Sequence, residues 1–253
     1  MHFALLGYGK MGRAIEALAP SRGHDIAVRI DNQTDWMEQI DALRQCDIAI
    51  DFSQPDVAVD NIMKCFNIGM PIVVGTTGWY DQLDDVVHDC KSRGQSLFVA
   101  SNFSIGMNIM FDLNRRLAAL MNRYDAYDVS ICEAHHIHKL DAPSGTAITL
   151  ANDIIERLDR KEEWQLAATL HPDQQPDATP AEQPVPDSAV AITSVRQGEV
   201  PGTHTVTYDS DIDTIAITHS AKSRKGLALG AILAAEYLST HRGYHTMTDL
   251  LSE

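Results

Sequence analysis

Short apolar runs alternate regularly with amphipathic segments over the first 105 residues of the chain. The amphipathic segments carry apolar residues three and four positions apart, as helices with one buried face do. Strands that alternate with such helices form parallel sheets covered by helices on both faces. The expected strands are 2–6, 25–30, 47–52, 71–74 and 96–100, and the crossover helices lie in 10–23, 34–45, 56–69 and 80–94.

Three glycines follow the first expected strand in the segment LLGYGKMGRAI, where Gly7, Gly9 and Gly12 have the spacing GxGxxG. Between a strand and a helix, the first glycine of this pattern permits a tight turn, the second lets backbone approach a pyrophosphate, and the third allows close helix packing. Glycines can also simply close such a turn. Asp31 favours the dinucleotide-binding interpretation, because it ends the second strand, where a carboxylate can bind ribose hydroxyls.

The residues around this loop bear on the choice of nicotinamide cofactor. Asn32 follows Asp31, so no arginine stands next to the carboxylate to bind a 2′-phosphate. NADH is therefore favoured. Lys10 and Arg13 lie on or beside the loop and can reach a phosphate, which leaves NADPH open. Lys10 and Met11 are counted with the glycines among the expected cofactor-binding residues.

Two further segments, GTTG and SNFS, end the fourth and fifth expected strands. Open α/β sheets bind ligands at this edge. The small residues of GTTG let a nicotinamide ribose approach, although a flexible turn has the same composition. In SNFS, the amide of Asn102 can orient a ligand amide and the ring of Phe103 can pack against a nicotinamide. These segments add Gly75, Thr76, Thr77, Ser101, Asn102 and Phe103 to the expected cofactor-binding residues.

The pattern changes beyond residue 105. A helix is expected at 107–123 and a strand with one buried face within 125–136. The segment 160–187 is polar and holds half of the ten prolines, which predicts a long surface loop that carries little core. Turn-rich connections suggest antiparallel pairing among the later strands, and a largely apolar last helix is expected to pack against the first domain or between the domains. These strands are 190–195, 203–209 and 213–220, and the helix is 226–240.

Together these patterns predict an α/β chain of two domains. The first domain, residues 1–105 completed by 220–253, is expected to form a Rossmann-type parallel sheet that binds a dinucleotide. The second, residues 106–219, is expected to be an α+β domain built on a mainly antiparallel sheet.

Composition narrows the classes of partner. The chain has 35 acidic and 20 basic residues and a formal net charge of −15, which argues against nucleic acid and anionic membranes as partners. No apolar run approaches the roughly 20 residues that cross a bilayer. The four cysteines form no CxxC pair and the chain opens with no export signal, so we expect a cytoplasmic location.

The segment CEAHHIHKLDAPSGTA concentrates groups that can move protons and bind anions. Alternation along a strand places Glu133 and His135 on one face. The SGT sequence opens a helix, whose free backbone amides form an anion site, and Lys139 adds a positive charge. Two alternatives are a capping turn among surface histidines and a metal site built from Glu133, His135 and His138. We favour a proton donor beside an anion clamp.

The run EAHHIHKLDAPSGTA resembles the EAHHxxKxDAPSGTA motif of the 4-hydroxy-tetrahydrodipicolinate reductases. The resemblance extends to the glycine loop, GTTG, SNFS, the VRQGEVPGTHTV hairpin and THSAKSR, and so covers essentially the whole chain. One departure is Asp31-Asn32, where many members have an acidic residue followed by arginine, and it bears on cofactor preference.

This resemblance implies roles that the spacing of residues cannot show. His135 would be the general acid, and Lys139 would assist proton delivery or hold the substrate. The family likeness also implies a homotetramer formed through the sheet of the second domain and a place for Arg224 near the cofactor end of the site. No bound metal is expected. The residues implied to bind the dicarboxylate substrate are His136, Ser144, Gly145 and Thr146.

The expected function is hydride transfer from NADH or NADPH to a cyclic unsaturated dicarboxylate, giving tetrahydrodipicolinate in lysine and diaminopimelate biosynthesis. Two alternatives stay open at this point. One is another two-domain NAD-dependent dehydrogenase, which would need no SGT clamp for a dicarboxylate. The other is a dinucleotide sensor without enzymatic activity, against which the acidic charge and the dense cluster of proton donors speak.

Overall fold

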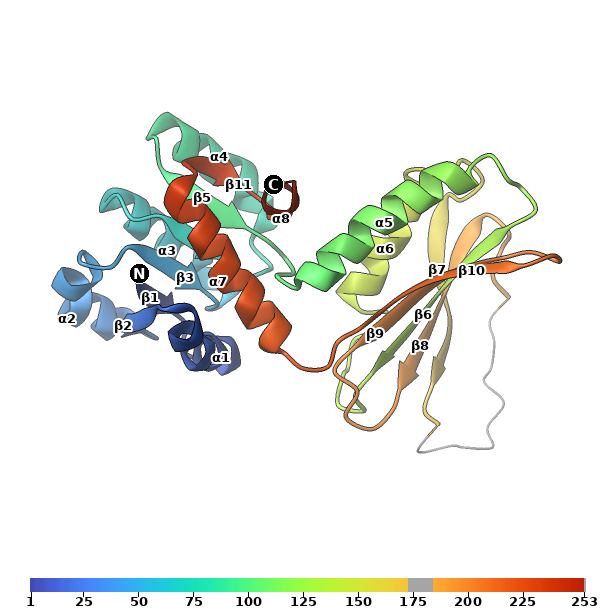
Figure 1. The fold of residues 1–253 in the computed structure, drawn as a ribbon, viewed down its shortest axis with the longest axis horizontal. Helices are drawn as coiled ribbons and strands as arrows, with labels where there is room; N and C mark the ends of the chain where they lie inside the picture. Colours follow the sequence, from blue (N-terminus) through green and yellow to red (C-terminus); the bar gives the residue numbers. More distant parts are fainter. Residues whose placement is uncertain (173–183, 253) are drawn as a thin grey trace. The chain divides into compact units, whose positions relative to one another are not determined.

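The computed structural model describes residues 1–172 and 184–252, and the chain divides into two compact units. Unit 1 comprises Met1–Asn108 and Arg224–Glu253, and unit 2 comprises Ile109–Ser223. Each unit has its own sheet, as Figure 1 shows. The expected α/β class, with a parallel sheet in one part and a second sheet in the other, is confirmed.

Unit 1 is built on a six-stranded sheet in the order β11-β5-β4-β3-β1-β2, with every pair parallel. The five expected strands are all present. The sixth, β11, was not predicted, because its three half-buried residues are too few to show the alternation of apolar and polar residues that indicates a strand. The strands are β1 (His2–Leu6), β2 (Asp25–Ile30), β3 (Ile48–Asp51), β4 (Ile72–Val74), β5 (Ser96–Val99) and β11 (Gly243–His245).

Helices cover both faces of this sheet. One face packs against α2 (Gln33–Leu43), α3 (Pro55–Asn67) and α4 (Leu83–Ser92). The other packs against α1 (Lys10–Leu18) and α7 (Lys225–Thr240), with α8 (Met247–Leu251) beside them. The expected return of the last long helix to the first sheet is therefore confirmed. The 3₁₀ helices η1 (Ala19–Arg22) and η2 (Tyr80–Gln82) complete the unit.

The strand order of unit 1 determines where a ligand can bind. The strand β1 lies between β2 and β3 in the sheet. The chain therefore passes from β1 to β2 on one side and then returns to β3 on the other side of β1, so the strand order reverses at β1. Doubly wound sheets bind ligands in the crevice outside the carboxyl ends of the strands at such a point. The glycine loop, GTTG and SNFS all follow strands at this edge.

Unit 2 holds a five-stranded sheet in the order β10-β9-β6-β8-β7. The strands are β6 (Asp128–His135), β7 (Glu163–Leu170), β8 (Ala189–Arg196), β9 (Thr203–Asp209) and β10 (Thr214–Ser220). The β6–β9 and β9–β10 pairs are antiparallel, whereas β6–β8 and β7–β8 are parallel. The sheet is thus mixed and not mainly antiparallel. The expectation failed because β6 lies between β8 and β9 in the sheet. The turn-rich connection from β8 to β9 therefore crosses β6 and does not form a hairpin.

The expectation of a long loop over 160–187 was wrong for its first part. Residues Glu163–Leu170 form the edge strand β7, which pairs along β8. The side chain of Lys161 is 3% exposed, and its Nζ donates to the carbonyl oxygens of Asp187 (2.7 Å) and Ala189 (2.9 Å). An edge strand with one fully buried residue lacks the alternation that marks a strand in sequence. Residues 173–183 of the predicted loop lie outside the described residues.

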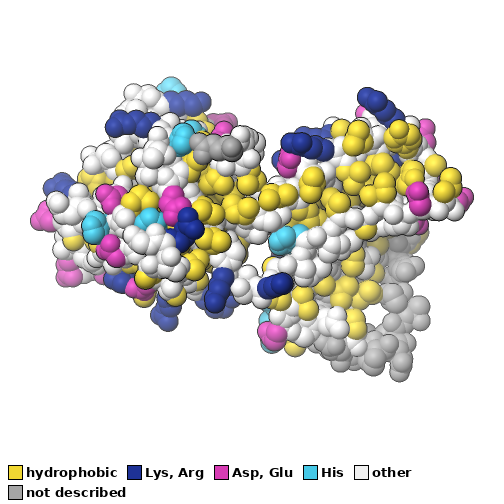
Figure 2. Space-filling model, viewed as in Figure 1, with side chains coloured by type: hydrophobic (Ala, Val, Ile, Leu, Met, Phe, Trp, Pro, Cys, Tyr) yellow, Lys and Arg dark blue, Asp and Glu magenta, His cyan; other side chains and the backbone are white. Residues whose placement is uncertain are grey.

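Two helices belong to this part of the chain, α5 (Ile105–Met121) and α6 (Gly145–Ile155). The buried residues of α6 pack on the sheet, and the side-chain amide of Asn114 in α5 donates to the Leu150 carbonyl of α6 at 3.0 Å. The outer side of α5 is apolar, as the yellow side chains over it in Figure 2 show. Its side chains Ile109, Leu113, Leu120 and, just beyond its end, Tyr124 are between 46% and 61% exposed. Among the described residues, no helix has the length and apolar character needed to cross a membrane.

Candidate active site

The carboxylate of Glu133 is held by several hydrogen bonds inside unit 2. Alternation along β6 places Glu133 and His135 on the same inward face, as expected, and Glu133 is fully buried. Its Oε1 accepts hydrogen bonds from Ser194 Oγ at 2.7 Å and from Arg196 Nη2 at 3.1 Å. Both of its oxygens lie 3.1 Å from the Ser144 amide. Three donors, one of them the guanidinium cation of Arg196, therefore converge on this side chain, and His135 lies beside them.

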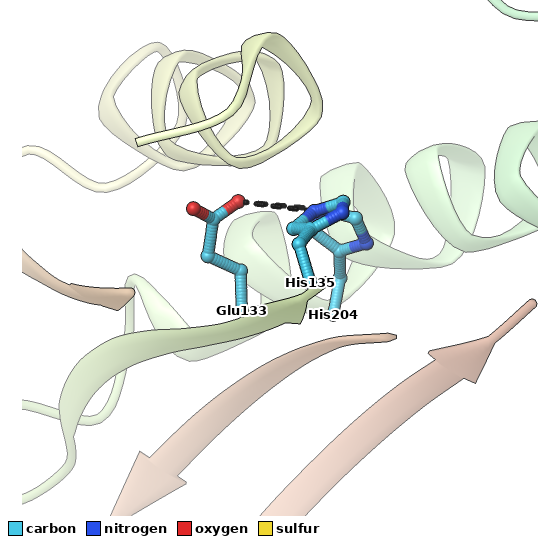
Figure 3. Close-up of side chains that lie close together, drawn as sticks. All are labelled: Glu133, His135 and His204. Atoms are coloured by element: carbon cyan, nitrogen blue, oxygen red, sulfur yellow. Dashed lines mark hydrogen bonds and ion pairs between the residues drawn. The ribbon is translucent and has the colours of Figure 1, made fainter. Parts of the chain in front are cut away.

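The pKa of Glu133 follows from these contacts. Burial acts to raise the pKa of this carboxyl, but hydrogen bonds from His135, Ser144 and Ser194, together with the nearby ring of His204, outweigh burial and hold it well below its ordinary value. Glu133 is thus an ionised carboxylate at neutral pH. Its Oε2 lies 3.4 Å from Nε2 of His135, the contact drawn as a dashed line in Figure 3. A carboxylate at this position stabilises the protonated imidazole and orients its ring.

A second imidazole, His204 of β9, lies beside His135, as Figure 3 also shows. Its Nε2 is 3.4 Å from Nε2 of His135, 3.2 Å from Oγ of Ser144 and 3.7 Å from Oε2 of Glu133. Sequence analysis did not single out His204. The alternation in THTVTYD places it on the inward face with Val206 and Tyr208, but nothing in the sequence shows that β9 pairs with β6 in the register that opposes His204 to Glu133.

The expected anion clamp lies at the start of α6. Ser144 caps this helix, and its Oγ accepts a hydrogen bond from the Ala147 amide at 3.2 Å. Gly145 and Thr146 are the first helical residues, so their amides have no carbonyl of the preceding turn to bind. Free amides at a helix N-terminus attract a carboxylate. The structure therefore brings the predicted Ser144 and the predicted His135 to one place, with His204 between them.

The other charged residues of the motif lie further out. Nζ of Lys139 donates to both carboxylate oxygens of Asp141, at 2.8 and 2.7 Å. Nδ1 of His136 is buried and has no hydrogen-bond partner among the described residues. His138 is exposed, and its Nε2 lies 2.9 Å from Oε1 of Glu199. Lys139 and His136 thus lie in the loop that follows β6, and among the described residues neither forms a hydrogen bond or ion pair with His135.

The metal site considered in the sequence is not assembled as expected. His138 contacts Glu199, and the group that the structure brings together is Glu133, His135 and His204. The guanidinium of Arg196 already binds Oε1 of this glutamate. Its positive charge opposes a divalent cation at the cluster, so the arrangement suits proton transfer better than metal binding.

Gly202 leaves room for the ring of His135. Its φ angle of +149° is one that residues with side chains rarely adopt, and a Cβ atom there would lie 3.0 Å from Cε1 of His135. A side chain at this position would crowd the imidazole. Gly202, just before β9, thus leaves the gap in which His135 sits, and β9 supplies His204.

In unit 1, the glycine loop has the geometry that its spacing predicted. Gly7 has a φ angle of +85°, and a Cβ atom there would lie 2.4 Å from the Phe52 carbonyl oxygen. A Cβ atom on Gly12 would lie 2.6 Å from the Gly7 oxygen. Gly9 caps α1 and has open space around it. The first and third glycines are therefore needed for packing, while the second leaves backbone open to a ligand. The expected residues Lys10 and Met11 begin α1, where Lys10 is exposed and Met11 is half-buried.

Asp31 lies at one side of a hollow beside this loop. Its Oδ1 accepts a hydrogen bond from the Tyr8 amide at 2.9 Å. Sequence analysis missed Trp36 and Lys64, which also line the hollow. Nζ of Lys64 lies 4.9 Å from the centre of the Trp36 ring and 2.7 Å from Oδ2 of Asp60. An aromatic wall and a lysine from α3 could not be placed beside Asp31 without the fold.

The GTTG segment contributes less exposed surface than expected. Gly75 follows β4, and a Cβ atom there would lie 2.2 Å from the Phe52 ring. Thr76 is buried, and its Oγ1 donates to Asp51 Oδ1 at 2.6 Å while accepting from the Ser53 amide at 2.9 Å. Thr77 is exposed. Gly75 and Thr76 therefore shape the loop, and Thr77 is the side chain of the three that faces solvent.

In SNFS, the expected residues divide in the same way. Ser101 is exposed, and Oδ1 of Asn102 accepts a hydrogen bond from the Ser104 amide at 2.9 Å. Phe103 is 1% exposed, with its ring centre 5.6 Å from that of Phe52 and 6.0 Å from that of Phe98. In this structure the Phe103 ring belongs to the core of unit 1. Arg224 precedes α7 as its N-cap residue.

Family models match both parts of the chain. The model described as dihydrodipicolinate reductase, C-terminus, matches residues 106–251, and the model described as dihydrodipicolinate reductase, N-terminus, matches residues 1–103. The chain belongs to the dihydrodipicolinate reductase family. It is therefore an oxidoreductase of a family that uses a nicotinamide dinucleotide, as the motifs implied.

Curated relatives carry the same activity in their names. A 4-hydroxy-tetrahydrodipicolinate reductase from Christiangramia forsetii is 44% identical over 253 residues, covering 100% of this chain and 98% of the relative. The enzyme of that name from Methanopyrus kandleri is 35% identical over 82% of this chain and 72% of its own length. Membership of this family sets aside the two alternatives, a different dehydrogenase and a dinucleotide sensor.

Solved structures bear on the fold alone. A dipicolinate-bound dihydrodipicolinate reductase from Paenisporosarcina sp. TG-14 has a TM-score of 0.74 and 22% identity, and 97% of each chain is covered. An amine dehydrogenase from Mycobacterium smegmatis has a TM-score of 0.58 at 10% identity, covering 98% of this chain and 95% of that one. Different dehydrogenases share this architecture, so the activity must be argued from the site.

Proposed function

We propose that this chain reduces 4-hydroxy-tetrahydrodipicolinate to tetrahydrodipicolinate with a hydride from NADH or NADPH, in lysine and diaminopimelate biosynthesis. One proton is taken up and one water is released in the balanced reaction. The observation that carries the proposal is the placement of His135 beside an ionised carboxylate, Glu133, with His204 between His135 and the Ser144 end of α6. That arrangement sets a proton donor beside a site for carboxylates.

The chemical roles divide between the cofactor and the protein. The nicotinamide supplies the hydride when bound. His135 protonates the substrate atom on which negative charge develops, and Glu133 stabilises the imidazolium that donates. The α6 amides, Ser144 and His136 bind the substrate carboxylates, and Lys139 contributes its charge once a substrate carboxylate competes with Asp141 for it. This division is supported by the family relationship and by the geometry of unit 2.

For the cofactor, we propose binding to unit 1 along the glycine loop. The pyrophosphate would lie at the N-terminus of α1, where the open space around Gly9 fits a close approach. The adenosine ribose would lie in the hollow beside Asp31. We favour NADH, because Asp31 repels a 2′-phosphate and Lys64 is already paired with Asp60. Thr77, Ser101 and Asn102 would lie toward the nicotinamide end.

The function is tested by the decrease in NADH absorbance, and separately NADPH absorbance, when purified protein meets freshly generated substrate. Oxidation of NADH at a higher kcat/KM than NADPH is expected. Asp31→Ala should raise the KM for NADH by about tenfold, because it removes hydrogen bonds to the ribose, while Glu38→Gln on the exposed side of α2 should leave it unchanged. Folded protein that binds NADH but oxidises neither cofactor would contradict the proposal.

We also propose that the chain forms a homotetramer through the outer face of the unit 2 sheet. This face is uncharged over its centre, and its hydroxyls pair between strands, as Thr205 and Thr218 do at 3.0 Å. Such a flat, uncharged surface suits burial against a second copy. Its central residues include Ser130, Cys132, Thr193, Thr205, Thr207 and Thr218.

A further inference from the structure

The imidazole of His204 touches both the general acid and the substrate clamp of the proposed function. It is 5% exposed, and its Nε2 lies 3.2 Å from Oγ of Ser144 and 3.4 Å from Nε2 of His135. We propose that His204 is a positioning residue that couples carboxylate binding at Ser144 to the orientation of the proton on His135. This inference rests on the function proposed above.

The argument begins with how many hydrogen bonds one nitrogen can make. A neutral imidazole nitrogen is either a donor or an acceptor, and not both. Nε2 of His204 has Ser144 Oγ and His135 Nε2 within reach, whereas Oε2 of Glu133 is 3.7 Å away, beyond hydrogen-bond length. His204 can therefore serve only one of its two near neighbours at a time, and its tautomer decides whether Nε2 donates or accepts.

The proposed coupling takes His204 as the Nδ1–H tautomer when no substrate is bound, so that the lone pair of Nε2 accepts. The Ser144 hydroxyl can donate to it, since Oγ uses one of its own lone pairs for the Ala147 amide. The N–H of His135 Nε2 can donate to the same lone pair. The proton of His135 is then shared between two acceptors, His204 and Glu133, and its ring has no single preferred arrangement.

A bound carboxylate changes this arrangement. A carboxylate offers no proton, so the Ser144 hydroxyl must donate to it. Oγ then has a lone pair free for His204, which becomes the Nε2–H tautomer and donates to it. His204 can no longer accept from His135, so the His135 Nε2–H turns fully to Oε2 of Glu133 at 3.4 Å. The imidazolium is thereby fixed with its other nitrogen, Nδ1, as the one that delivers the proton.

Substitution of His204 tests this coupling through activity. His204→Leu should lower kcat about 10- to 100-fold, as expected for a lost hydrogen bond to a charged group, and should weaken binding of dipicolinate while the Kd for NADH is unchanged. His204→Gln places an amide nitrogen near the Nε2 position and should restore most of both losses. His219→Gln is the matched control, since this half-buried imidazole lies opposite His204 across β9 and β10.

A spectroscopic measurement on the unmodified protein makes the test independent of any variant's folding. In ¹⁵N-histidine-labelled protein, addition of dipicolinate should convert His204 to the Nε2–H tautomer, and Ser144→Ala should abolish that conversion. Unchanged kcat in His204→Leu, or a His204 tautomer indifferent to dipicolinate, would overturn the inference. Absence of NADH oxidation by the wild-type protein would instead contradict the proposed function, since the tautomer shift does not depend on turnover.

Discussion

Oε2 of Glu133 lies 3.4 Å from Nε2 of His135, and the glutamate is fully buried while the histidine side chain is 12% exposed. The carboxylate is thus shielded from water, whereas the imidazole remains partly accessible to water. A buried negative charge held by fixed donors does not reorganise when a neighbouring ring gains or loses a proton, which is how preorganised electrostatics assists catalysis.

Glu133→Gln should impair both activity and stability. The neutral amide cannot stabilise an imidazolium, so kcat should fall by about 10- to 100-fold. It also leaves the buried guanidinium of Arg196 without its charge partner, which should cost about 3–5 kcal/mol in the free energy of unfolding. Steady-state kinetics and urea denaturation measure the two effects. Glu199→Gln at the exposed His138 pair serves as the control, and equal effects of the two changes would refute the role of Glu133.

Gly202→Ala should slow catalysis through the ring of His135. The added methyl group meets Cε1 of the imidazole at 3.0 Å in a backbone conformation that already disfavours alanine. We expect kcat to fall about tenfold or more, since small misplacements of a catalytic group are costly. Gly23→Ala controls for backbone strain, because Gly23 has a φ angle of +76° and nothing near its Cβ position. Full activity in Gly202→Ala would show that the ring tolerates displacement.

Stability should depend on pH through Glu133. Its pKa in the folded chain lies below its ordinary value of 4.5, so its stabilisation is present above about pH 4.5 and is lost as the pH falls below it. Urea denaturation followed by circular dichroism should show a free energy of unfolding that falls from pH 5 to pH 3. The slope should be shallower in Glu133→Gln.

The buried Asp51 of unit 1 provides a control of opposite sign. Burial raises the pKa of this carboxyl despite hydrogen bonds from Thr76, Ser53 and Asn61. A raised pKa gives stabilisation that is present at low pH and lost as the pH rises through the folded value. Asp51→Asn should therefore steepen the acid loss of stability that Glu133→Gln reduces. The same slope in both variants would show that these two groups do not govern the acid response.

The oligomeric state should depend on the outer face of the unit 2 sheet. Thr205→Glu places a charge at the centre of that face and should shift the tetramer to smaller species, because a buried unpaired charge is costly. Light scattering after size exclusion measures this. Leu120→Glu, on the exposed apolar side of α5, should leave the tetramer intact. Dissociation by Leu120→Glu alone would place the interface on α5 instead.

The sequence was most informative where chemistry depends on neighbours along the chain. The glycine loop, the shared face of Glu133 and His135, and the cap at Ser144 are local features, and each lies where its spacing predicted. His204 could not be found in this way, because its contacts depend on the register between two strands about 70 residues apart. Location in the cytoplasm and the tetramer stay predictions.

The errors in the fold have a similar cause. The edge strand β7 carries too few buried residues to alternate clearly, and the parallel placement of β8 beside β6 depends on a crossover that turn residues do not encode. Lys64 and Asp31 lie on separate segments of unit 1, and they line the same hollow only because the fold brings those segments together. Long-range pairing decides all three cases, and local propensity carries little information about it.

The central claim, that His135 donates the proton in a reduction by NADH, is tested most directly by the kcat of His135→Gln with 4-hydroxy-tetrahydrodipicolinate. The account predicts that kcat falls about 10²- to 10⁴-fold, while the Kd for NADH and the thermal midpoint stay close to wild type. A His135→Gln protein that turns over at the wild-type rate would contradict it.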